Sequence, residues 1–198
     1  EQEDEELITE DEARLQDERK LAARVFEQSS NAIIVTDPEQ RIVTVNPRME
    51  QISGYRPEEL IGRSPRIFSS GQHDQAFYAA MWHEINDKGL WQGLITNRRK
   101  NGDLIDEWLS ISSVRNRDGA LSHYVGIFED VTEERRRDSL IRRLSRAVEQ
   151  SPASIAITNL EPAIEYVNPA FEAVTGYSSE EVCGHNPALQ QSGLTSPE

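Results

Sequence analysis

The sequence predicts an antiparallel α+β domain followed by the first half of a second copy. The segment at residues 27–47 recurs at residues 149–169 without a gap, so that Asn46-Pro47 returns 122 residues later as Asn168-Pro169. Within the first copy, two β-rich runs precede several short helical segments, and three further β-rich runs follow. This order is typical of an antiparallel sheet with its helices gathered on one face.

The first half of the domain combines strand signals with well-marked helix ends. The run AIIVT is β-rich, and the Asn46-Pro47 pair supplies an N-cap and a first helical residue. Gly54 closes that helix as a C-cap. The expected elements are a helix at 21–28, strands at 32–36 and 41–45 joined by a turn at 37–40, a helix at 46–54 and a helical turn at 57–60.

The second half begins with a longer helix, expected from its N-cap Asp74 to about residue 87, with Gly89 beyond its end. Its apolar positions follow the spacing of one buried face: Phe77, Tyr78, Met81, Trp82 and Ile85. Three strands are expected at 91–100, 103–114 and 121–130, and Asn101-Gly102 between the first two is a strong hairpin signal.

From residue 132 the pattern becomes helical and highly charged. Ile141, Leu144 and Val148 are spaced three and then four residues apart, as are the apolar positions of a coiled coil. We therefore expect a stiff helical connector that pairs with its twin in a homodimer. The predicted organisation is an acidic N-terminal helix or tail (1–20), a first domain (21–131), the connector (132–146) and the N-terminal half of a second, truncated domain (147–198).

Composition narrows the choice of partners and compartment. The net charge of −14 argues against nucleic acid or an anionic membrane as a partner. No apolar run approaches the roughly 20 residues of a membrane span, and no signal pattern opens the chain, so a cytoplasmic location is expected. Because the chain begins at Glu1 rather than Met, we expect a longer protein, whose other parts include any membrane anchor. The only cysteine, Cys183, excludes an internal disulfide and any multi-cysteine metal site.

Several motifs, in this order, resemble those of PAS domains. They are Asn46-Pro47, Gly54-Tyr55, the segment EELIG at 58–62, the hairpin NRRKNG at 97–102 and the closing segment GIFEDVT at 126–132. The resemblance implies a five-stranded antiparallel sheet with short helices on one face, flanked by N- and C-terminal signalling helices. It also implies a tandem sensory module of a bacterial signal-transduction protein. Such modules typically dimerise and precede an output domain, a cyclic-di-GMP synthase or phosphodiesterase or a histidine kinase, and none of these lies in this chain.

Asn97 is the unusual residue of the strand expected at 91–100. It shares a strand face with Trp91, Gly93 and Ile95, where an apolar residue is expected. A carboxamide directed into a concave pocket needs hydrogen-bond partners, which a heteroaromatic ring could supply. Gly93 would leave room for the ring, and Trp82 on the facing helix would stack on it.

Trp82 and Asn97 resemble the pocket of FAD-binding PAS redox sensors from the nitrogen-fixation and methane-oxidation regulators. There the matching Trp packs against the isoalloxazine and the matching Asn hydrogen-bonds to it. The resemblance implies FAD, with Trp82, Asn97, Ile34 and Gly93 as the cofactor-binding residues. Ile34 and Pro65 depart from a pocket Ser and a pocket Glu of the nitrogen-fixation sensor. The alternative is a pocket without a ligand, in which Trp82 is core, Asn97 pairs with backbone or water, and the domain serves dimerisation or protein interaction.

Two other cofactor modes are not expected. Haem would need an axial histidine over the pocket. His73 is expected at an exposed helix start, and His83 lies about 100° around the helix from Trp82. A light-driven flavin–cysteine adduct would need a cysteine in the loops after Gly62 or Gly184, which contain RSPRIF and HNPALQ instead.

Catalytic motifs are missing from the sequence. It contains no P-loop, GxSxG, HExxH or paired-cysteine motif, so no catalytic or metal site is assigned, and any enzymatic activity is expected in an output domain. The basic run Arg98-Arg99-Lys100 is interpreted as a local salt-bridge partner or a dimer contact.

Overall fold

The computed structural model describes the backbone of residues 2–190 and the side chains of residues 12–189. The chain divides into two compact units, Glu1–Glu133 and Glu134–Glu198, each described separately below. The domain limits expected from the sequence remain predictions. Within residues 2–190, no helix combines the length and the apolar character that crossing a lipid bilayer requires.

The first unit opens with α1, one helix over Gln2–Gln28 rather than a short helix at 21–28. The acidic N-terminus is therefore helical from Gln2 onward. Oppositely charged neighbours support such a helix at exposed positions, with Arg14 3.7 Å from Glu18 and Lys20 3.6 Å from Asp17. These pairs are spaced four and three residues apart, which places both partners on one side of the helix.

The strands β1 (Ala32–Thr36) and β2 (Ile42–Val45) pair antiparallel. Helix α2 (Pro47–Ser53) follows directly, and the Asn46 side chain caps it by accepting from the Met49 N–H. Gly54 ends the helix with φ 75°, a left-handed conformation that glycine adopts without strain. Both caps confirm the sequence prediction.

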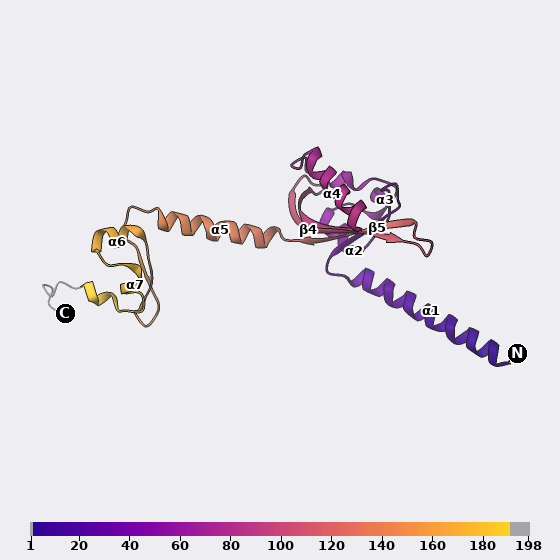
Figure 1. Cartoon of the computed structure of the whole chain (residues 1–198), viewed down its shortest axis with the longest axis horizontal. Helices are drawn as coiled ribbons and strands as arrows, with labels where there is room; N and C mark the ends of the chain where they lie inside the picture. Colours follow the sequence, from indigo (N-terminus) through magenta and orange to yellow (C-terminus); the bar gives the residue numbers. More distant parts are fainter. Residues whose placement is uncertain (1, 191–198) are drawn as a thin grey trace. The chain divides into compact units, whose positions relative to one another are not determined.

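Three further helical segments follow α2: α3 (Pro57–Leu60), the 3₁₀ helix η1 (Pro65–Phe68) and α4 (Gln75–Lys88). Figure 1 shows α3 and α4 on the same side of the sheet. Asp74 caps α4 as predicted, because its carboxylate accepts from the Phe77 N–H at 2.8 Å. Of the apolar positions expected on one buried face of α4, Met81 and Ile85 are buried, while Phe77, Tyr78 and Trp82 are partly buried and pack against the core.

The strands β3 (Leu90–Arg98), β4 (Leu104–Arg115) and β5 (Leu121–Asp130) complete an antiparallel sheet in the order β2-β1-β5-β4-β3. This confirms the predicted five-stranded α+β fold. The hairpin turn is longer than expected, since β3 stops at Arg98 instead of residue 100. Lys100 leaves the strand ladder because its N–H donates to the carbonyl of Ser53 on α2 at 2.9 Å.

Side chains alternate between the two faces of each strand, and those on one face form the core. Residues on one face of β3 are buried, whereas several of their neighbours on the other face are exposed. The helices pack onto the buried face. Its core contains Ala32, Ile34, Trp91, Ile95, Ile105, Leu109, Tyr124 and Phe128 from the sheet.

The second unit repeats the beginning of the first. Its elements are α5 (Thr132–Glu149), β6 (Ala156–Thr158), β7 (Ile164–Val167), α6 (Pro169–Thr175), α7 (Ser179–Val182) and η2 (Pro187–Gln190). A small core joins Ile164, Val167, Phe171 and Val182.

Asn46 and Asn168 perform the same structural task in the two units. Asn46 is 1% exposed, accepts from the N–H groups of Ile33 and Met49, and donates to the carbonyl of Phe26 near the end of α1. Asn168 is fully buried and donates to the carbonyl of Val148 near the end of α5. Each asparagine thus ties the preceding helix to the start of the domain.

Candidate functional site

A cavity of about 550 Å³ lies in the first unit, lined by residues of the sheet, η1 and α4. This volume falls within the roughly 300–1,000 Å³ that is usual for small-molecule sites. Buried apolar side chains form much of its wall: Ile34, Phe68, Met81, Ile95, Leu109 and Phe128. Exposed polar residues also line it: Ser64, Arg66 and Gln75.

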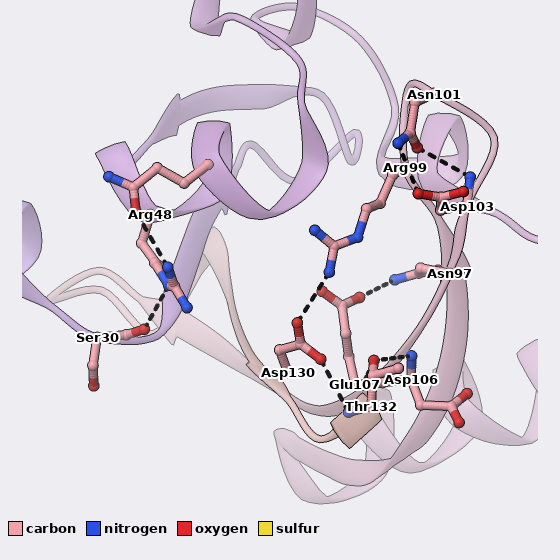
Figure 2. Close-up of polar contacts among 11 residues, drawn as sticks. Ser30, Arg48, Asn97, Arg99, Asn101, Asp103, Asp106, Glu107, Asp130 and Thr132 are labelled. Atoms are coloured by element: carbon pink, nitrogen blue, oxygen red, sulfur yellow. Dashed lines mark hydrogen bonds and ion pairs between the residues drawn. The ribbon is translucent and has the colours of Figure 1, made fainter. Parts of the chain in front are cut away.

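Asn97 faces inward, as predicted from strand alternation. It lies on the cavity wall and is only 6% exposed. Its Nδ2 donates to Glu107 Oε2 at 2.8 Å (Figure 2). The two residues are diagonal neighbours, because Asn97 pairs with Ile105 across β3 and β4 and Glu107 lies two residues further on. The partner of the buried amide is therefore a carboxyl group from the adjacent strand.

Glu107 is a buried acid whose pKa is raised from 4.5 to about 7. Burial is the main cause, because it disfavours the charged form, while the hydrogen bond from Asn97 opposes the rise. The negative charge of Asp130, directly across the β4–β5 ladder, adds to the rise, and the positive charge of Arg99 opposes it. Glu107 therefore changes its charge near neutral pH.

The same corner of the sheet holds the start of α5 (Figure 2). Arg99 pairs with Asp130 at 3.0 Å. The backbone N–H of Asp106 donates to Thr132 Oγ1 at 3.0 Å, and the Thr132 N–H donates to Asp130 Oδ1 at 3.0 Å. Asp130 thus contacts both Arg99 in the hairpin turn and Thr132, the first residue of α5.

Trp82 and Ile34, two of the residues expected to bind a cofactor, both line the cavity. Trp82 comes from α4 and is partly buried. Its ring meets Tyr124 edge-on, with ring centroids 5.3 Å apart and an interplanar angle of 75°. Ile34 on β1 is 3% exposed and adds an apolar contact surface.

Gly93 has a different role from the one expected. It is not among the residues that line the cavity, and a Cβ atom at this position would lie 2.6 Å from the Trp91 indole. The missing side chain therefore makes room for Trp91 in the core, not for a ligand.

Neither histidine weighed as a haem ligand lines the cavity. His73 is partly buried, not at an exposed helix start, because its Nε2 accepts from the Thr96 N–H at 2.9 Å and its ring stacks on Phe77. His83 is exposed on α4.

The basic run has the local role predicted for it. Arg99 pairs with Asp130, Lys100 lies 2.6 Å from Glu59, and Arg98 donates to the carbonyl of Ser70 at 2.8 Å. An isolated antiparallel β-bridge also joins the backbone of Ser69 to that of Asn97. The loop before α4 thereby covers the free edge of β3 beside the cavity.

Sequence reasoning missed Glu107 and the cavity-lining Arg66. Glu107 alternates with Ile105 and Leu109 on one face of β4, a pattern visible in the sequence. The opposite face carries Leu104 and Trp108, which look equally suited to a core. Hydrophobicity therefore gave no reason to place the glutamate inside.

A five-stranded antiparallel sheet with a cavity under short helices, leading into a C-terminal helix, defines a cavity-bearing α+β domain. Residues 30–133 match the PAS domain family, and residues 142–194 match it a second time. The chain belongs to the PAS domain family.

Known relatives carry this domain within longer proteins. A nitrogen fixation regulatory protein of Klebsiella oxytoca is 27% identical over 152 residues, which cover 75% of this chain and 31% of the relative. A blue-light photoreceptor of Listeria innocua is 38% identical over 109 residues, covering 54% of this chain and 43% of the relative. The solved structure of an RNA-binding Light-Oxygen-Voltage receptor superimposes with a TM-score of 0.58 and 31% identity, covering 65% of this chain and 36% of that chain. The chain spans less than half the length of each.

Proposed function

We propose that the chain is a sensory input module that detects a flat heteroaromatic ligand in the cavity of its first PAS domain. The observation that carries this proposal is the position of Asn97, a buried carboxamide on the wall of an otherwise largely apolar cavity. A pocket of this kind, mostly apolar with few fixed polar groups, is the usual form of a small-molecule site. Regulators and photoreceptors among the relatives support a sensory role.

The lining favours a flavin as the ligand. Trp82 offers an aromatic surface, Asn97 offers a hydrogen-bonding edge, and Arg66 is the one charged side chain among the lining residues. A flavin nucleotide combines a ring system with donors and acceptors along its edge and an anionic phosphate tail, which Arg66 would bind. Bound flavin would supply a redox couple, and the resemblance to FAD-binding redox sensors supports FAD in particular. A cysteine-dependent light reaction is not part of the proposal, since Pro65 and Arg66 occupy the relevant loop and Cys183 lies in the second unit.

The signal is proposed to leave through the corner where Glu107 lies. Asn97 contacts Glu107, Asp130 lies opposite Glu107, and Thr132 at the start of α5 contacts Asp130. A ligand that binds one arrangement of this corner more tightly than another would bias α5 between two states. Equal mobility of a spin label on α5 with and without ligand would contradict this route.

The helix α5 is proposed to pair with its twin in a homodimer and to lead toward an output domain, a cyclic-di-GMP enzyme or a histidine kinase. Its apolar side chains are exposed within the described chain, Ile141 by 56% and Leu144 by 58%. An exposed apolar seam on a charged helix is the pattern of a coiled coil.

A second candidate function is a protein-interaction module without a ligand. It is favoured by apolar residues that are exposed on the outer face of the sheet, among them Leu104, Trp108 and Ile127. In this alternative, the outer face would bind a partner and Asn97 would serve the fold alone.

A flavin fluorescence titration separates the two functions. We expect FAD or FMN fluorescence to change saturably with the wild-type chain, and Asn97→Leu to weaken binding roughly tenfold to a hundredfold. Asn101→Ala, in the exposed hairpin turn, is the matched control and should bind like wild type. No saturable change with the folded wild-type chain would favour the interaction module.

A further inference from the structure

Asn97 and Glu107 form an asymmetric pair. An ionised carboxylate only accepts hydrogen bonds, so a charged Glu107 requires Asn97 to present its NH₂ group, as the 2.8 Å contact shows. Among the described residues, none donates to Asn97 Oδ1. The structure nevertheless has no fully buried side-chain oxygen or nitrogen without a partner within the described residues. The Oδ1 atom is therefore accessible, and Asn97 lines the cavity.

We infer that Glu107 sets the hydrogen-bond polarity of the cavity by fixing the orientation of the Asn97 carboxamide. With Glu107 as a carboxylate, Nδ2 faces the glutamate and the acceptor Oδ1 is left for the cavity. With Glu107 as a carboxylic acid, its O–H donates to Oδ1, and the turned amide presents its NH₂ donors to the cavity. Glu107 is thus a positioning residue, which acts on a ligand through Asn97.

The consequence for ligands rests on the proposed ligand-binding function. A ring edge that offers an N–H matches the carboxylate form, whereas a ring edge that offers a carbonyl or a deprotonated nitrogen matches the acid form. Binding of an acceptor-type ligand would then take up a proton at Glu107, and binding of a donor-type ligand would release one. The cavity would thus couple ligand chemistry to proton uptake through the rotation of one wall side chain, Asn97.

The surroundings of Glu107 suit such a change of charge near neutral pH. The charged groups that act on it are Asp130 from β5 and Arg99 from the hairpin turn, and these two also pair with each other. The neighbouring Asp106 carboxylate bonds to Thr96, and Glu129 is exposed on β5. Burial moves the pKa of Glu107 to about 7, where a cell's pH holds both forms.

The test uses the whole ligand-free chain. NMR would follow the Glu107 side-chain carboxyl carbon and the Asn97 side-chain NH₂ group through a pH titration. We expect both signals to change with one shared midpoint in the neutral range. Glu107→Gln cannot ionise in this pH range, so the Asn97 signals should stay constant across the titration. Asn97 signals that stay constant while Glu107 titrates would overturn the inference.

Two further variants keep the test decisive. Asp130→Asn removes the negative charge opposite Glu107, so both midpoints should move together to lower pH even if Glu107→Gln does not fold. Glu129→Gln makes the same charge change at an exposed position of β5 and should leave both midpoints in place. A parallel titration with FMN tests the binding function separately. Shared midpoints without FMN binding would retain the polarity change and reject the flavin site, whereas FMN binding without shared midpoints would do the reverse.

Discussion

Glu107 and Trp108 are neighbours on β4, and the charged residue is the buried one: the glutamate is 3% exposed and the tryptophan 46% exposed. Successive side chains of a strand point to opposite faces, so placing one inside places the other outside. For these two side chains taken alone, burying the tryptophan and exposing the glutamate would be favoured by several kcal/mol. The contacts that compensate on the inner face are the Asn97 hydrogen bond and the packing of Ile105 and Leu109 on either side.

The first prediction concerns stability against pH. Because the folded-state pKa of Glu107 is raised from 4.5 to about 7, the native state binds the proton more tightly than the unfolded chain. Stability from this group is full below pH 4.5 and is lost as pH rises through about 7. Glu107→Gln lacks this loss, so its unfolding free energy relative to wild type should rise by roughly 3 kcal/mol across that window.

Urea unfolding at a series of pH values measures this difference. Glu129→Gln is the control and should follow the wild-type pH dependence, because Glu129 is exposed. An offset between Glu107→Gln and wild type that is the same at every pH would show that Glu107 titrates normally.

The second prediction concerns the Asn97 contact. The hydrogen bond from Asn97 lowers the pKa of Glu107, so its removal in Asn97→Leu should raise that pKa above about 7. Carboxyl-detected NMR would report the midpoint directly. A midpoint that falls in Asn97→Leu would mean that the amide stabilises the neutral acid, contrary to the observed donor contact.

The third prediction concerns Gly93. A Cβ atom there would lie 2.6 Å from the buried Trp91 ring, so Gly93→Ala should cost roughly 1–3 kcal/mol of stability through overpacking. In a Trp91→Leu background the same change should cost less, since the clashing ring is gone. Equal costs in the two backgrounds would place the clash elsewhere.

The fourth prediction concerns the joint at Asn46. This side chain is buried and serves two backbone N–H groups and two carbonyls, so Asn46→Ala should cost roughly 2–4 kcal/mol. Asn101→Ala, in an exposed turn, should cost less than about 1 kcal/mol. Thermal unfolding compares the two variants. Similar losses of stability would show that the Asn46 hydrogen bonds do not stabilise the fold more than those of an exposed turn.

The fifth prediction concerns self-association. If α5 pairs with its twin through its exposed apolar residues, Ile141→Asp should weaken the dimer by placing like charges in the seam. Arg146→Gln makes the same unit change in charge about 200° around the helix from Leu144 and is the control. Sedimentation equilibrium gives the dimer affinity, and equal affinities for the two variants would exclude this seam.

Much of the fold follows from local signals in the sequence. Asn46, Gly54 and Asp74 mark helix ends through backbone chemistry that needs no tertiary context, and each has its predicted role. The strand face of Asn97 was also predictable, because alternation along β3 depends only on strand geometry. The length of α1 was not, since its charged surface is compatible with either a helix or a tail.

The partners within the site were less accessible to sequence reasoning. The Asn97–Glu107 contact depends on the β3–β4 register, which the five-residue turn at 99–103 sets. The turn length depends in turn on the Lys100 contact with α2, a tertiary interaction. The role of Gly93 required knowledge of the Trp91 ring position, which a strand pattern does not contain.

The most direct measurement is a visible absorption spectrum of the purified chain after incubation with excess FAD and removal of the free flavin, recorded before and after dithionite. The proposed function predicts retained flavin bands that bleach on reduction in wild type and are lost in Asn97→Leu. A folded wild-type chain that retains no flavin absorption would contradict the flavin-binding cavity and leave Asn97 as a partner of Glu107 alone.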